Sequence, residues 1–103
     1  MTTTIKGKTY TFKVLDFLGY AEGRKLGFRF DAAIKAFQEA GDDESVDAAT
    51  TLLKQAWDSM VTFAIEGDAT GLEFKGTRLE DMKGFFQDFA IAALGTTPKS
   101  NAA

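Results

Sequence analysis

Reactive side chains are scarce in this sequence of 103 residues, which contains no histidine and no cysteine. The lack of imidazole removes the usual general base at neutral pH, and the lack of thiol removes the thiolate nucleophile. Both losses also remove the common zinc ligands. Ser45 and Ser59 are the only serines before residue 96, and neither lies in the Gly-x-Ser-x-Gly motif of an exposed nucleophile. These residue types predict that the chain is not an enzyme.

Carboxylates are the remaining candidates for chemistry. Asp42, Asp43 and Glu44 are consecutive, whereas a calcium loop needs acids at alternate positions and a glycine at the sixth. We therefore expect a solvated loop there, with no metal and no cofactor. The segment Gly23-Arg24-Lys25-Leu26-Gly27 places bases between glycines but matches no phosphate-binding motif. We interpret it as a helix end, with contact to a phosphate or a partner as the alternative.

The net charge of −3 is unevenly distributed along the chain. Residues 1–29 carry a net charge of +4, residues 30–69 carry −7, and residues 70–103 are neutral. This segregation favours head-to-tail or cross-subunit contacts. The alternative is a solvated surface on which the charged side chains are unevenly distributed.

Three of the four lysines in residues 1–29 lie near aromatic residues, a combination found in proteins that bind single-stranded nucleic acid. They are Lys6, Lys8 and Lys13, beside Tyr10 and Phe12. However, the sequence pI of about 4.8 opposes attraction to phosphates. We therefore expect no nucleic-acid partner.

The hydrophobic pattern predicts a mainly α protein with a short N-terminal β-hairpin, about four helices and a single domain. Tyr10, Phe12 and Val14 alternate with polar residues, so residues 3–14 are predicted to form the hairpin, with Lys6-Gly7-Lys8 as its turn. Because an isolated two-stranded hairpin is not stable in water, its apolar face must pack on helices or on another chain.

Apolar residues at steps of three and four predict the helices. With their cap and stop signals, these span Asp16 to about Leu26, Ala32–Ala40, about Val46–Ile65, and a last helix that begins at a Thr77–Glu80 capping box and runs to about Leu94. Gly27 stops the first helix, and Phe28 and Phe30 follow in a linker. The domain is expected to span residues 1–95, and the polar residues 96–103 to form a disordered tail.

Aromatic residues are abundant, with ten Phe, two Tyr and one Trp. Phe85 and Phe86 point about 100° apart on a helix, so both are buried only if the helix is covered over a broad arc. Either these rings all enter the core, or one side of the arc contacts another molecule. The candidate residues for a partner or oligomer interface are Tyr10, Phe12, Gly19, Gly23, Phe85, Phe86 and Phe89.

The start of the chain, Met-Thr-Thr-Thr, lacks a basic and then apolar leader. The apolar runs are far shorter than the roughly 20 residues that cross a bilayer. We therefore expect a cytoplasmic protein, in the host cytoplasm if it is viral, with no membrane partner.

The order of elements resembles that of tail assembly chaperones of long-tailed bacteriophages and related gene transfer agents. The matching features are the hairpin Thr4-Ile-Lys-Gly-Lys-Thr-Tyr-Thr-Phe, an aromatic helix closing with Leu26-Gly27, a small helix, a longer helix with a central Trp57, and a last amphipathic helix before a polar tail. The resemblance covers about residues 3–95. It includes no diagnostic motif, so no functional residue is transferred.

This resemblance implies a non-enzymatic chaperone of virion assembly. Such a protein binds the tape measure protein through apolar helical surface, keeps it soluble, helps recruit tail tube protein and forms homo-oligomers. A small acidic phage inhibitor is the alternative; it would bind a host protein or mimic nucleic acid through the acidic residues 30–69. The size of the particle in solution separates the two hypotheses, because the chaperone forms dimers or larger rings.

Overall fold

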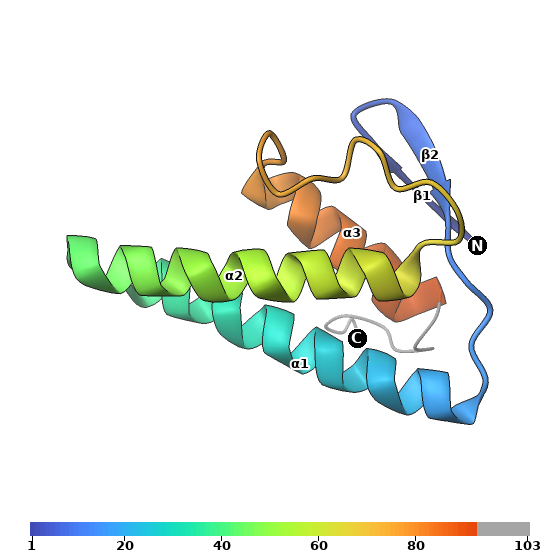
Figure 1. The fold of residues 1–103 in the computed structure, drawn as a ribbon, viewed down its shortest axis with the longest axis horizontal. Helices are drawn as coiled ribbons and strands as arrows, with labels where there is room; N and C mark the ends of the chain where they lie inside the picture. Colours follow the sequence, from blue (N-terminus) through green and yellow to red (C-terminus); the bar gives the residue numbers. More distant parts are fainter. Residues whose placement is uncertain (93–103) are drawn as a thin grey trace, which may run out of the picture.

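Three helices and a two-stranded hairpin make up the fold in the computed structural model, which describes residues 1–92. In chain order the elements are β1 (Thr2–Ile5), β2 (Lys8–Thr11), α1 (Phe17–Glu39), α2 (Asp43–Ala64) and α3 (Leu79–Ala92). The two long helices form an antiparallel pair along the longest axis of the molecule (Figure 1). The hairpin and α3 lie toward the end of this pair where α2 ends.

The hairpin has the antiparallel pairing that was predicted, with Ile5 opposite Lys8. Its loop is therefore only Lys6-Gly7, and both residues have positive φ angles of 53° and 80°. This is the signature of a two-residue turn that matches the twist of the strands. Phe12 forms a further antiparallel bridge with Ile65 after α2. The inward face is thus Tyr10 and Phe12 without Val14.

The prediction that Val14 belongs to the apolar face of the hairpin was wrong, because its side chain is fully exposed. The strand β2 ends at Thr11, and the backbone N–H of Lys13 donates to the carbonyl of Ala64 at 2.8 Å. Beyond this bond the chain leaves the sheet for the start of α1. The alternation of residues 10–14 therefore continued past the last paired residue.

Helix α1 is continuous from Phe17 to Glu39, so the prediction of two helices separated at Gly27 was wrong. The predicted number of about four helices is accordingly three. Gly27 lies buried inside α1, and Phe30 from the expected linker is 1% exposed. A glycine in a helix costs about 1 kcal/mol relative to alanine. Burying one large apolar side chain contributes about 1.5–3 kcal/mol, which offsets that cost.

Aspartates begin the first two helices. Asp16 accepts a hydrogen bond from the Gly19 backbone N–H at 2.8 Å, as its predicted role as a cap requires. Asp42 caps α2 in the same way, through the Ser45 N–H at 2.7 Å. The predicted capping box of the last helix was wrong. Thr77 instead donates its hydroxyl to the Glu73 carbonyl at 2.5 Å.

The end of α3 gives no test of the predicted C-terminal boundary. Within the described chain α3 runs to Ala92. The predicted continuation to Leu94, the domain end at residue 95 and the tail of residues 96–103 lie outside the described residues.

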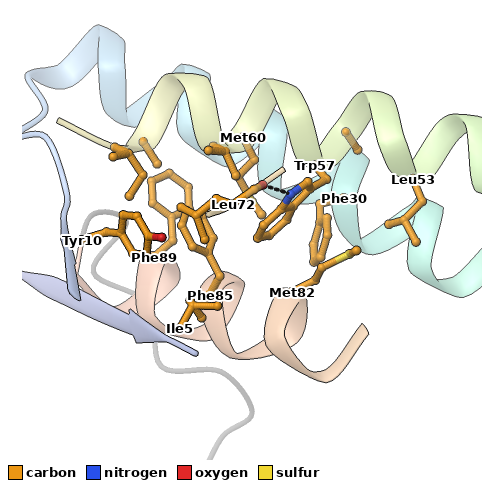
Figure 2. Close-up of a cluster of buried hydrophobic side chains, with 14 of the residues drawn as sticks. Ile5, Tyr10, Phe30, Leu53, Trp57, Met60, Leu72, Met82, Phe85 and Phe89 are labelled. Atoms are coloured by element: carbon orange, nitrogen blue, oxygen red, sulfur yellow. Dashed lines mark hydrogen bonds between the residues drawn. The ribbon is translucent and has the colours of Figure 1, made fainter. Parts of the chain in front are cut away.

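The core lies between α2, α3 and the hairpin, and α1 adds Phe30, Ala33 and Ile34; Figure 2 shows Phe30 beside Trp57. Trp57 is fully buried at its centre, with its ring centroid 5.0 Å from that of Phe85 and 6.1 Å from that of Phe30. Its Nε1–H donates to the Leu72 carbonyl at 2.7 Å, which joins α2 to the loop of residues 65–78. The core therefore holds the one polar atom of its largest side chain in a hydrogen bond.

Candidate protein-binding surfaces

Four of the aromatic residues predicted for an interface lie inside the chain. Tyr10 and Phe12 are each 4% exposed, and Phe85 and Phe89 are fully buried. The ring centroid of Phe12 is 5.5 Å from that of Phe85 and 5.7 Å from that of Phe89. In this conformation these side chains are covered by their own chain, as in the interpretation that places them in the core.

The other three predicted residues do not form one patch with them. Phe86 is partly buried, with its ring centroid 5.3 Å from that of Phe30. Gly23 is buried in α1. Gly19 is half-buried, and its backbone N–H is used by the cap of α1. The structure therefore brings together the aromatic residues of the hairpin and α3, and places the two glycines elsewhere on α1.

Tyr10 fastens the hairpin to the loop of residues 65–78. Its hydroxyl donates to the Thr70 carbonyl at 2.7 Å. Burial raises the pKa of Tyr10, and the nearby carboxylates of Glu73 and Asp68 raise it further. Because the phenol stays protonated at neutral pH, it serves as a hydrogen-bond donor and not as a base.

The carboxylates of this loop are engaged in local hydrogen bonds. The side-chain and backbone bonds from Thr70 lower the pKa of Asp68, and the backbone N–H of Gly71 lowers the pKa of Glu73. Both side chains accept from their own loop and shape its turn. Among residues 1–92, no group of three or more carboxylates is placed to hold a metal ion.

The hairpin lysines also contact the chain itself. Lys6 donates to the Gly76 carbonyl at 2.8 Å, and Lys8 donates to the Thr70 carbonyl at 3.0 Å. Lys13 donates a third hydrogen bond of this kind to the Thr62 carbonyl at 3.4 Å. These ammonium groups hold the hairpin against the loop and α2, although their side chains are exposed.

An open groove runs between α1 and α2. It encloses about 400 Å³ and is lined by Leu26, Arg29, Ala32, Ala33, Leu52, Gln55, Ala56 and Ser59. A second hollow of about 530 Å³ shares Leu26, Arg29 and Ser59 with it and extends toward Glu22 and Phe63. Small side chains in such a groove let another helix approach closely. The groove was not predicted from the sequence. Leu52 lies outside the buried apolar stripe of α2, so the hydrophobic pattern did not point to it.

A second apolar feature lies on the outer side of α1. Phe17 is 78% exposed and Phe28 is 65% exposed; Leu18 of α1 and Val14, which precedes the helix, are also exposed. Sequence reasoning missed this surface because it assigned Phe28 to a linker. A helix continued through Gly27 places Phe17 and Phe28 eleven residues apart, which is close to three full turns on one face.

Within the described part of the chain, no helix is both long enough and apolar enough to cross a membrane. Compared with models of protein families, with curated proteins and with solved structures, the chain matches none.

Proposed function

We propose that this chain is a non-enzymatic tail assembly chaperone that binds the tape measure protein and helps recruit tail tube subunits in the host cytoplasm. The observation that carries the proposal is the open groove between α1 and α2. Tape measure proteins are helical and rich in aliphatic residues, so the partner is an amphipathic helix. A groove between two helices is a common docking site for such a helix.

The lining of the groove suits this partner. Leu52 supplies apolar contact area above the buried Leu26, and the small side chains of Ala32, Ala33 and Ala56 leave room for the backbone of an incoming helix. Leu52 keeps 52% of its surface exposed, so a bound helix would remove apolar area from water. The absence of histidine and cysteine from the sequence also favours binding over catalysis.

The second candidate is a small acidic inhibitor that binds a host protein or mimics nucleic acid. It is favoured by the five acidic residues around the turn between α1 and α2, which are Glu39, Asp42, Asp43, Glu44 and Asp47. None of them forms an ion pair with a base in residues 1–92. An inhibitor of this kind would work as a monomer and would use the acids in place of the groove.

Co-expression with the tape measure protein of the same genome tests the proposal. The tape measure protein should stay in the soluble fraction and copurify with the chain at a fixed ratio. Leu52→Lys should abolish both effects, because it places an ammonium group in the groove. Thr51→Lys is the matched control, since Thr51 is the exposed neighbour on α2 that does not line the groove.

The two variants separate the possible outcomes. Loss of copurification in Leu52→Lys but not in Thr51→Lys supports the groove as the binding site. Equal copurification in both variants rejects the groove. A tape measure protein that precipitates in the presence of the unmodified chain rejects the chaperone function.

A further inference from the structure

Four side chains form a continuous ladder along the outer face of α1. Phe17 stacks on Tyr20 with ring centroids 6.4 Å apart and planes 29° apart. The guanidinium of Arg24 lies 5.9 Å from the centre of the Tyr20 ring and 5.5 Å from that of Phe28. Arg24 also donates to the Tyr20 hydroxyl at 3.2 Å. We call Phe17, Tyr20, Arg24 and Phe28 the α1 ladder.

The ladder is held in shape but is not neutralised. Arg24 contacts two rings, and it forms no ion pair with any acid among the described residues. Lys25, the next residue, is exposed and likewise lacks an ion pair within residues 1–92. The exposed part of the ladder is therefore an apolar surface with positive charge, which fits an apolar partner bearing negative charge.

The opposite end of the molecule has the complementary character. Glu39, Asp42, Asp43, Glu44 and Asp47, which we call the acidic turn, lie where α1 gives way to α2 (Figure 1). Residues 39–47 contain no base. Val46 is 36% exposed within this region and shares one face of α2 with Asp43 and Thr50. The acidic turn thus presents a small apolar side chain among carboxylates.

The two surfaces cannot meet within one chain. Arg24 and Glu39, where α1 ends and the acidic turn begins, are 15 residues apart along one helix, which is about 22 Å at 1.5 Å per residue. Each surface is therefore available to another molecule at the same time. A contact between different surfaces on two copies is heterologous, and its repetition gives a ring or an open filament.

We propose that the α1 ladder binds the acidic turn of a second copy of this chain, so that copies associate head to tail. The carboxylates of the acidic turn would pair with Arg24 and Lys25, and Val46 would pack against the exposed ring of Phe28. Homo-oligomers are already implied by the resemblance on which the proposed function rests. The inference assigns the two surfaces that meet, and it uses neither the groove nor the tape measure protein.

Charge favours a second copy over the other possible occupants of the ladder. Two ladders facing each other would bring Arg24 and Lys25 against their own copies, and like charges in contact oppose association. Nucleic acid would be repelled by the net charge of −3 and most strongly by the acidic turn. The acidic turn supplies both the negative charge and the exposed apolar side chain that complement the ladder.

Sedimentation equilibrium over micromolar to millimolar concentrations of the full chain tests the proposal. The average mass should rise with concentration above the 11.2 kDa of one chain and fall when salt is added. Arg24→Glu and Asp47→Lys should each raise the dissociation constant about tenfold or more, because each brings like charges into contact. Lys83→Glu and Glu66→Lys are the matched controls; they change the net charge equally at exposed sites outside both surfaces.

Mixing the two variants gives the decisive measurement. Arg24→Glu has an intact acidic turn and Asp47→Lys has an intact ladder, so an equimolar mixture should recover the association that each variant lacks alone. Far-ultraviolet circular dichroism verifies that each variant is folded. A monomeric mass for the unmodified chain at all concentrations overturns the proposal. Binding of a labelled single-stranded oligothymidine by that monomer would assign the ladder to nucleic acid and would likewise count against the proposal. Weakening by Arg24→Glu alone, without an effect of Asp47→Lys, would show that the ladder contacts a surface other than the acidic turn and also overturns it.

Discussion

Trp57 shows how much of the fold depends on single side chains. Its ring is in edge contact with Phe85 of α3 and lies beside Phe30 of α1, so one residue of α2 contacts both other helices. Its indole N–H holds the carbonyl of Leu72 in the loop that precedes α3. Packing and hydrogen bonding therefore act together at this position.

Replacing Trp57 separates these two contributions. Trp57→Ala should lower the free energy of unfolding by about 3–5 kcal/mol, because it leaves a cavity in the core. Trp57→Phe retains much of the packing but leaves the Leu72 carbonyl without its donor, at a cost of about 1–3 kcal/mol. Urea denaturation followed by circular dichroism measures both. Equal stability of the two variants would mean that the ring volume is unimportant.

The position of Gly71 has no room for a side chain. Its φ is +101°, and an added Cβ would collide with the Tyr10 hydroxyl that bonds to Thr70. Gly71→Ala should therefore destabilise the protein by about 1–3 kcal/mol. Gly41→Ala is the control, since no atom lies within 4 Å of the Cβ it would add. Thermal melting should show a lower midpoint for the first variant only.

Asp42 should make stability depend on pH. The backbone N–H of Ser45 lowers the pKa of this carboxyl, so the folded state binds its proton less readily than the unfolded chain. The stabilisation is complete above the unfolded value of about 3.9 and is lost as the pH falls through the lower folded value. Asp42→Asn retains the cap without the titration, so its denaturation midpoint should fall less steeply below about pH 4. Parallel curves for the two proteins would assign the acid sensitivity to other groups.

At the scale of elements, local signals located some helix boundaries and missed others. The predicted ends at Ala40 and Ile65 lie within one residue of those observed, whereas α2 begins at Asp43 and not at about Val46. Asp16 acts through a hydrogen bond to the residue three positions along the chain, so its role as a cap was visible in the sequence. Asp42, Asp43 and Glu44 were expected in a loop, but Asp42 caps α2 and the other two form its first turn.

Whether the helix stops at Gly27 depends on tertiary packing, which the sequence does not display. Continuation of α1 buries Phe30 against Trp57, and this contact outweighs the weak helix propensity of glycine.

Helix α3 offers a test of propensity where packing does not intervene. Gly84 lies inside α3, and no atom lies within 4 Å of the Cβ that an alanine would add there. Gly84→Ala should stabilise the protein by about 0.4–1 kcal/mol, since alanine restricts the unfolded chain and favours the helix. Chemical denaturation measures the gain. A loss of stability would show that this position needs the freedom of glycine.

At the scale of the molecule, the sequence was least informative about its surfaces. The aromatic residues of the hairpin and α3 could be assigned to a core or to an interface, and only their mutual distances separate the two in one chain. The groove arises from the antiparallel pairing of two helices, and the α1 ladder from the continuity of one helix that was predicted in two pieces. Surfaces made by pairing distant segments leave no pattern in either segment alone.

The hairpin contacts the rest of the molecule through Phe12, so removal of this side chain should destabilise the whole fold. Phe12 contacts Phe85 and Phe89 of α3 and bridges to Ile65 after α2, which ties the first residues of the chain to both helices. Phe12→Ala should therefore lower the free energy of unfolding by about 3–5 kcal/mol, a large share of the 5–15 kcal/mol typical of a domain.

Cooperativity distinguishes this coupling from local fraying of the hairpin. In Phe12→Ala, Trp57 fluorescence and circular dichroism should still change at the same urea concentration, because one core connects all the elements. Thr11→Ala is the control on the same strand; its side chain faces solvent, so a change within about 0.5 kcal/mol is expected. If Phe12→Ala left the Trp57 transition unmoved, the hairpin would be an appendage, and the helices would form a core without it.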